Sequence, residues 1–251
     1  MTSGSNDQVY QSIGVGYSAA RRPDPRIQRL IDTALGDARS VVNVGAGTGN
    51  YEPAGRRVVA VEPSLKMIGQ RRAGSAPATR AVAEALPFGD QTFEASLATF
   101  TLHHWTDLAG GMSEMRRVAR RQVVLLFEPW ETWKFWLVEY FPECLSLPSE
   151  IRAPSVEDVR AYLDVQTVLP VPVPADCIDG FAGAYWRRPE AYLDSSVRAG
   201  ISSLAQLSGQ VAERCVQRLR EDLASGEWDA RYGYLRELPE IDLGYRLLIA
   251  G

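Results

Sequence analysis

Three closely spaced glycines directly after a short apolar run limit most strongly what this chain can fold into. The segment 41–44 (Val-Val-Asn-Val) has the β-branched side chains of a buried strand, and Gly45, Gly47 and Gly49 follow at once. Glycine lets the backbone turn sharply and approach a ligand where a Cβ atom would collide. Such a loop after a strand is typical of an open α/β sheet, in which ligands bind beyond the carboxyl ends of the strands.

Strand and helix patterns alternate through the first half of the chain. Apolar, β-rich runs predict five strands, at 40–44, 58–61, 79–82, 93–99 and 122–127. Amphipathic segments predict helices at 24–35, 64–72 and 106–119, the last capped by Thr106. The alternation predicts an α/β fold with a Rossmann-like, doubly wound sheet.

The second half is mostly helical in pattern. It holds a strand near 166–174 and a C-terminal strand at 241–250, which predicts a seven-stranded sheet with an antiparallel last strand and a helical insertion as a cap. We expect three parts. These are an entrance segment with the Rossmann-like core at 1–128, a lid or substrate-binding insertion at 129–238, and a strand returning to the core sheet at 239–251.

Charge and cysteine usage narrow the kind of partner. A net charge of −4 and a pI near 5.4 argue against a nucleic-acid-binding surface. Three cysteines without CxxC spacing and two histidines predict reduced thiols in a cytoplasm and no metal site. No apolar run reaches the ~18 residues of a membrane span, and the polar start lacks a signal-peptide core. We expect a cytoplasmic protein without membrane insertion, and oligomeric state stays open.

The loop chemistry separates the nucleotides that it could bind. A dinucleotide loop needs GxGxxG, but Asn50 holds the sixth position, and no Lys follows as a P-loop requires. Pro53 and Gly55 interrupt the helix whose N-terminus a pyrophosphate would need. S-adenosylmethionine (SAM) carries no phosphate, so the loop favours SAM over NAD or ATP. Glu62, at the end of the second strand, either accepts hydrogen bonds from a ribose diol or is a solvated acid.

Four motifs carry a resemblance to a known family: VVNVGAGTGNYE (41–52), VVAVEPSLKMI (58–68), AEALPFGDQTFEASLA (83–98) and TLHHWTD (101–107). Over about residues 10–128 the chain resembles the class I SAM-dependent methyltransferases of the ubiquinone-biosynthesis type. The resemblance implies methyl transfer from SAM to O, N or C of a small, partly apolar acceptor in secondary or cofactor metabolism, with S-adenosyl-L-homocysteine as product. Val82 departs from the family, since many members carry an adenine-binding Asp there.

The resemblance also implies a set of SAM-binding residues, namely Tyr17, Arg21, Gly45, Ala46, Gly47, Gly49, Glu62, Pro63, Met67, Ala83, Glu84, Ala85, Phe100 and Thr101. In this set Tyr17 and Arg21 approach the SAM carboxylate, and the glycine loop lines the methionine and ribose. Met67 or Pro63 packs on adenine, and 83–85 borders its edge. The pair at 100–101 lies near the sulfonium.

Methyl transfer leaves little catalytic chemistry to the protein. The sulfonium carbon is already electrophilic, so orientation is the main contribution, and a base is needed only where the acceptor must lose a proton. His103 and His104 are candidate bases beside the expected methyl donor, because imidazole titrates near neutrality. The pair could instead shape the loop, and Glu128 is a rival base.

Aromatic residues crowd the segment after the fifth strand. Trp130, Trp133, Trp136 and Tyr140 recur at helical spacing, which indicates either a core-facing stripe or a lid over an apolar substrate. Trp186 in the later helical block is a similar candidate for substrate binding.

Two other functions stay open: an RNA methyltransferase, disfavoured by the acidic balance, and a SAM-fold binding partner that no longer transfers methyl groups.

Overall fold

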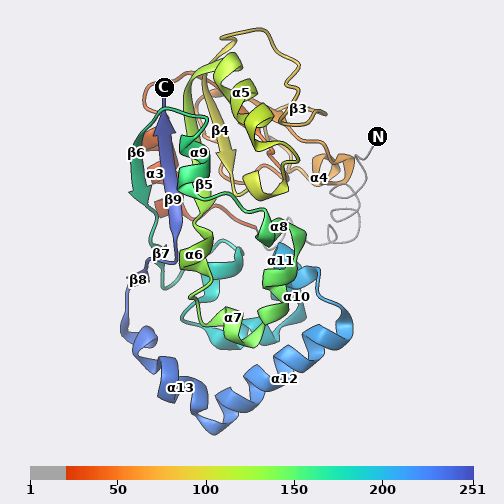
Figure 1. Ribbon diagram of the computed structural model, residues 1–251, viewed down its shortest axis with the longest axis vertical. Coiled ribbons are helices and arrows are strands. Elements are labelled where there is room, and N and C mark those ends of the chain that lie inside the picture. Colours follow the sequence, from red (N-terminus) through yellow and green to blue (C-terminus); the bar gives the residue numbers. More distant parts are fainter. Residues whose placement is uncertain (1–20) are drawn as a thin grey trace.

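The computed structural model describes residues 21–251, which form a sheet flanked by helices with a helical cap at one end (Figure 1). The main sheet has seven strands in the order β3-β2-β1-β4-β5-β9-β6. Their bounds are β1 Ser40–Val44, β2 Arg57–Val61, β3 Ala78–Thr79, β4 Phe93–Thr99, β5 Ala119–Phe127, β6 Val165–Pro170 and β9 Tyr245–Ala250. A separate two-stranded sheet joins β7 (Val173–Pro174) to β8 (Glu240–Ile241).

Strand direction confirms the predicted topology. β1 to β5 pair in parallel, and β9 runs antiparallel between β5 and β6. The register pairs Val44 with Val61, so the residues that follow them, Gly45 and Glu62, leave the sheet side by side. The glycine loop and the strand-end acid therefore share one edge of the sheet.

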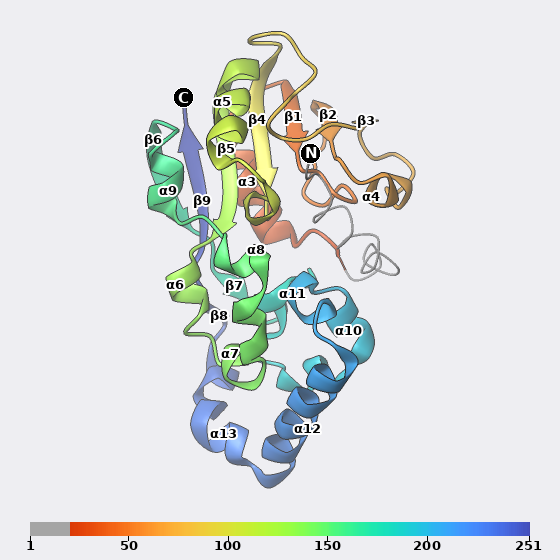
Figure 2. The ribbon, with the colours of Figure 1, turned by 45° about the vertical axis from the view of Figure 1, so that its right-hand side comes forward.

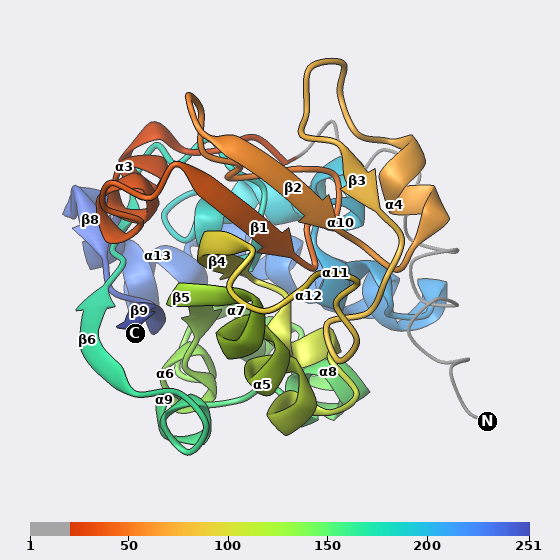
Figure 3. The ribbon, with the colours of Figure 1, turned by 90° about the horizontal axis from the view of Figure 1, so that it is seen from above.

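Helices cover both faces of the sheet (Figure 3). α3 (Pro25–Ala34) begins at Asp24, whose carboxylate accepts from the Arg26 N–H, and it buries Ile27 and Ile31 in one core cluster. α5 (Leu108–Val118) and α9 (Val156–Arg160) contribute to the cluster on the other face. Because both faces are covered, the buried positions of the central strands are mostly apolar, as in other parallel sheets, with buried polar exceptions that include Asn43, Ser96 and Gln122.

Several elements are shorter than the sequence predicts. The helix expected at 64–72 is α4 (Leu65–Gly69), and the strand expected at 79–82 is the two-residue β3. Asp107, not Thr106, caps α5, because the Asp107 carboxylate accepts from the N–H of Gly110. The Thr106 N–H and hydroxyl bond to Glu84 instead.

The cap lies beyond the carboxyl ends of the parallel strands and consists mostly of short helices (Figure 2). Its α-helices are α6 Pro129–Thr132, α7 Leu137–Tyr140, α8 Pro148–Ile151, α10 Ser195–Ala199, α11 Ser202–Ala205, α12 Gly209–Ser225 and α13 Glu227–Tyr232. Short 3-10 helices complete the described chain: η1 Leu102–His104 beside the sheet, and η2 Pro142–Ser146, η3 Ala182–Tyr185, η4 Pro189–Leu193 and η5 Gly233–Glu237 in the cap. Proline stands at the first position of α6, α8, η2 and η4, where its fixed φ favours the start of a new helix and its missing N–H leaves no bond unmade.

The cap has an aromatic core of its own. Trp136 is 3% exposed, its indole N–H donates to the Trp186 carbonyl over 2.8 Å, and its ring meets Tyr140, Tyr192 and Trp228 edge to face. Trp136, Tyr140 and Trp186 were expected to bind substrate, but they line neither of the two cavities described below. They hold the short cap helices together, because their large rings supply the buried area that such helices otherwise lack.

Candidate active site

A large cavity of about 810 Å³ lies at the carboxyl ends of β1, β2 and β4. Most of the residues that the family resemblance singles out line it: Arg21, Gly45, Ala46, Gly47, Glu62, Pro63, Met67, Ala83, Glu84, Phe100 and Thr101. Gly49 and Ala85 are not among its lining residues, and Tyr17 lies outside the described residues. The fold thus brings four separate sequence motifs to one space.

The glycine loop can have this shape only with glycine at its first position. Gly45 has a φ of +69°, and a Cβ atom there would lie 2.0 Å from the Thr101 hydroxyl oxygen. The N–H groups of Gly45 and Ala46 both donate to the Val61 carbonyl, at 2.9 and 3.0 Å. The loop therefore folds back against β2 and leaves a cradle that a larger side chain would fill.

Glu62 connects the loop to the end of β2. Its carboxylate is buried, and it accepts from the Gly47 N–H at 2.8 Å through Oε2 and from the Ser64 N–H at 2.9 Å through Oε1. An ionised carboxylate has about four acceptor sites, so both oxygens can also accept from a ligand. The side chain therefore shapes the cradle and presents acceptors to it.

Two other acidic candidates have structural roles. Glu84 lines the large cavity, but its Oε1 accepts from Thr106 and Asp107 and so fixes the start of α5. Glu128, the rival base, lines neither cavity described in this section, because its carboxylate accepts from the Val156 N–H at the start of α9. The site set implied by the resemblance also missed lining residues within the motifs, at 48, 50–51, 64 and 105–106, and next to them, at 80–82 and 99.

Arg21 joins the loop to the cap. Its guanidinium pairs with the buried Asp179 at 2.7 Å, and the Asn50 amide donates to the other Asp179 oxygen at 3.1 Å. Asp179 lies 158 residues from Arg21 in the sequence, so no local pattern could have predicted the pair. The contact draws the cap over the edge of the large cavity.

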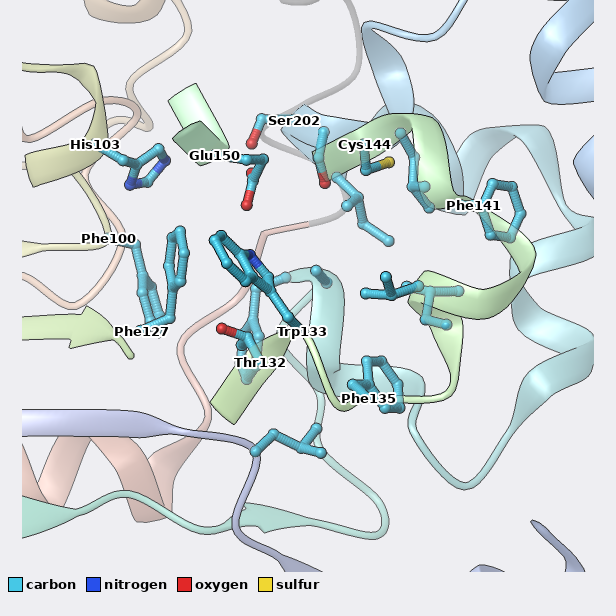
Figure 4. Close-up of a pocket in the computed structure, with 18 of the residues that line it drawn as sticks. Phe100, His103, Phe127, Thr132, Trp133, Phe135, Phe141, Cys144, Glu150 and Ser202 are labelled. Atoms are coloured by element: carbon cyan, nitrogen blue, oxygen red, sulfur yellow. The ribbon is translucent and has the colours of Figure 1, made fainter. Parts of the chain in front are cut away.

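A small cavity of about 120 Å³ lies inside the cap beside the large one (Figure 4). The two cavities share Arg21, Phe100 and His104 as lining residues. Phe100 has a φ of +51°, which is strained for a residue with a Cβ atom, and its ring packs on Phe181 at 5.3 Å. Strained backbone of this kind often occurs at functional sites, and Phe100 forms a wall where the cavities meet.

The histidines are buried at the same junction. His103 lines the small cavity, His104 lines both, and their rings lie 3.9 Å apart. Burial, with smaller contributions from His104 and Arg21, holds the pKa of His103 well below its ordinary value. Burial and Arg152 lower the pKa of His104 to about 4. Both rings are therefore neutral at neutral pH and bind a transferred proton only weakly.

The aromatic candidates separate into three environments. Trp133 lines the small cavity, together with Phe127, Phe135 and Phe141. Trp130 was also expected to bind substrate, but it is 68% exposed and lines neither cavity. Its ring packs on Trp133 from outside, at 5.0 Å. As shown above, the other aromatic candidates form the cap core. The four-residue α6 explains the division, since a helix this short cannot keep a long stripe on one face.

One acidic side chain in the small cavity was not predicted. Glu150 of α8 lines it, and burial raises the pKa of this carboxyl to about 7.

Within residues 21–251 no group of three or more potential metal ligands occurs. Over the same residues, no helix is long and apolar enough to cross a membrane.

Comparison with known proteins finds methyltransferases by sequence and by structure. Residues 42–127 match a family described as a methyltransferase domain. A demethylmenaquinone methyltransferase of Mycolicibacterium paratuberculosis is 32% identical over 165 residues, which are 63% of this chain and 67% of the relative. Another, from Renibacterium salmoninarum, is 36% identical over 38% of this chain, but the match spans only 44% of that relative's length. Among solved structures, a putative methyltransferase from an antibiotic biosynthesis pathway of Anabaena variabilis has a TM-score of 0.85 and 33% identity, covering 92% of this chain and 99% of that one.

Proposed function

This chain belongs to the class I SAM-dependent methyltransferases, and we propose that it transfers the SAM methyl group to a small, partly apolar acceptor. One observation carries the proposal: a large cavity built from the family's motifs meets a small apolar cavity at Phe100. Methyl transfer needs the donor carbon and the acceptor atom in line and in contact. Two cavities with a common wall meet that requirement.

The large cavity takes the donor in this proposal. The Gly45 cradle and the acceptors of Glu62 fit the methionine and ribose parts of SAM, which carry no phosphate. Met67 and Pro63 lie where an adenine ring could pack, and Arg21 is near enough to the same cavity to meet a carboxylate. SAM supplies the electrophilic methyl group, and these residues bind and orient it.

The small cavity takes the acceptor. An apolar cavity of roughly 150 Å³ can hold a benzene molecule, so about 120 Å³ suits one ring or a group of similar size. The cavity walls limit the access of water to the transfer, and orientation alone can supply ~7–11 kcal/mol of the barrier reduction. In the proposal His103 and His104 orient the acceptor and exclude water, because their low pKa values make them weak bases.

The same reasoning gives the division of labour along the chain. The core at 1–128 binds the donor, and 129–238 supplies most of the acceptor cavity and the strand β6. The segment 239–251 returns to the sheet as β9 and adds Leu243 and Tyr245 to the acceptor cavity. A cavity of only about 120 Å³ favours a small metabolite over RNA as acceptor. Three unpaired, buried cysteines are compatible with a reducing compartment, so we place the reaction in the cytoplasm.

The experiment measures binding of the methyl donor and methylation of the acceptor separately. The protein is titrated calorimetrically with SAM, S-adenosylhomocysteine, NAD and ATP, and is then incubated with methyl-labelled SAM and pools of small metabolites. We expect micromolar-scale binding of the first two ligands only, and a labelled small product formed together with S-adenosylhomocysteine. Tight NAD binding without SAM binding would overturn the proposal. SAM binding with no product from any pool would favour a SAM-fold binding partner instead.

A further inference from the structure

The small cavity contains a carboxylate, that of Glu150, that makes no hydrogen bond or ion pair with the described part of the chain. Glu150 projects from α8 into the cavity, and in Figure 4 its carboxylate lies between His103 and Ser202. Among the described residues no hydrogen bond or ion pair engages this carboxylate, whereas the carboxylates of Glu139, Glu143, Glu190 and Asp222 elsewhere in the cap all have partners. A partly buried acid without a partner is costly for the fold, so it invites a functional explanation.

An unpaired donor lies in the same cavity. The indole nitrogen of Trp133 is buried and has no hydrogen-bond partner within the described part of the chain. Figure 4 shows the indole below the Glu150 carboxylate, with both turned toward the cavity. Thr132, Ser202, Ser203 and Tyr245 also bring hydroxyl groups to the lining, but the Thr132 hydroxyl donates to the Glu128 carbonyl and the Tyr245 hydroxyl accepts from the Gly183 N–H. Most of the other walls are apolar, so beside the histidines, Arg21 and the two serines an acceptor meets a carboxylate and an indole N–H that have no partner among the described residues.

A hydroxyl group can satisfy both positions. A hydroxyl can donate its hydrogen to a carboxylate and accept from an indole N–H at the same time. A protonated amine could use only the carboxylate, and an ether or a keto group only the indole. The aromatic walls and the single-ring volume favour a hydroxyl carried on a flat, apolar ring, that is, a compact phenol.

We propose that Glu150 is the general base of the reaction, and that it takes the proton of a phenolic acceptor whose oxygen receives the methyl group. This inference rests on the proposed function. The O–H bond breaks, and its hydrogen passes to a Glu150 carboxylate oxygen. The oxygen forms a bond to the SAM methyl carbon, and the sulfur keeps the electron pair of the broken S–C bond. The products are an aryl methyl ether and S-adenosylhomocysteine, with the proton on Glu150 for release to solvent.

None of the neighbouring titratable groups named here changes charge near neutral pH, so the pH dependence of kcat/KM near pH 7 should follow the Glu150 carboxyl. Those that line the cavity or interact electrostatically near it are Arg21, His103, His104, Cys144, Arg152 and Tyr245. The pKa of His104 is lowered to about 4 and that of Cys144 is raised to about 12, and burial moves His103 down and Tyr245 up. Glu150 is thus the member of this group that changes charge near neutrality, and its deprotonated fraction rises as pH rises through about 7.

The test compares Glu150→Gln and Trp133→Phe with wild type and with Glu213→Gln. Glu213 is exposed on α12 and lines neither cavity, so its substitution makes the same chemical change elsewhere. The probes are 4-methylphenol, 4-methylaniline and toluene, each tested for binding in the presence of S-adenosylhomocysteine and for methylation with SAM. Thermal melts and SAM calorimetry on every variant show that the fold and the donor site are intact.

We expect wild type and Glu213→Gln to bind 4-methylphenol at least about tenfold more tightly than toluene and to form 4-methylanisole. In Glu150→Gln, kcat/KM falls by ~10²–10⁴, the range for loss of a general base, and its rise with pH below about 7 disappears. Trp133→Phe weakens phenol binding but keeps the pH profile. Equal binding of phenol and toluene, methylation of the amine alone, or an unchanged pH profile in Glu150→Gln would each overturn the inference. Loss of SAM binding in wild type would instead refute the proposed function itself.

Discussion

Replacing Glu150 by Gln should stabilise the protein at high pH and have little effect at low pH. Burial raises the carboxyl pKa from 4.5 to about 7 in the folded chain, so folding disfavours the ionised form. Below the ordinary value the carboxyl is neutral in both states and costs nothing. As pH rises from 4.5 toward about 7, the Glu150 carboxyl ionises in the unfolded chain but stays protonated in the folded chain, and the free energy of unfolding falls. The Gln side chain does not titrate, so it escapes this loss.

The magnitude follows from the two pKa values. The interval between 4.5 and about 7 corresponds to a full penalty of about 3 kcal/mol, at ~1.36 kcal/mol for each pH unit. Linkage places about 2.5 kcal/mol of this penalty between pH 5 and pH 8. In a chain of this size ~1 kcal/mol shifts Tm by ~2–4 °C. Relative to wild type, Glu150→Gln should therefore gain about 5–10 °C in Tm as pH rises from 5 to 8.

Thermal melts of wild type, Glu150→Gln and Glu213→Gln at these two pH values measure the effect. Any pH-independent cost of placing Gln in the cavity cancels, because only the change with pH is compared. The exposed Glu213→Gln should follow wild type at both values. A Tm difference between Glu150→Gln and wild type that stays constant with pH would show that burial does not raise the pKa of the Glu150 carboxyl.

The remaining predictions concern the donor cradle and the two tryptophans. Glu62→Gln places an amide N–H₂ against a backbone N–H and should weaken SAM binding by about 1–3 kcal/mol in calorimetry, and unchanged affinity in a folded variant would contradict this. Gly45→Ala should abolish SAM binding or folding, since its Cβ would meet the Thr101 hydroxyl at 2.0 Å, and an active variant would show that the loop relaxes. Trp136→Ala should cost ~3–5 kcal/mol of stability in chemical denaturation, because the ring is buried in the cap core. Trp133→Ala should instead raise the acceptor KM with a smaller loss of stability, and equal destabilisation of both variants would argue against Trp133 as a cavity wall.

The donor side of the site could be predicted from the sequence because its residues follow local rules. Parallel strands of a doubly wound sheet end at one edge, so Gly45, Glu62 and Thr101 converge there once their strands are recognised. The register of β1 against β2 then sets the loop beside the acid without help from distant residues. Even the lining residues that were missed lie within these motifs or next to them along the chain.

The acceptor side could not be predicted in this way. Whether Trp133 or Trp136 faces a cavity depends on how helices of about four residues pack on segments 50 residues away or more, and their periodicity is too short to decide. Arg21 and Asp179 meet across 158 residues, and Glu150 acquires its raised pKa only from the walls that close around it. The sequence by itself therefore determined the sheet and the donor cradle, because both arise from periodicity and strand-end geometry. Only the tertiary structure decided the acceptor cavity and its unpaired acid, because burial and the lack of a partner are properties of the packed chain.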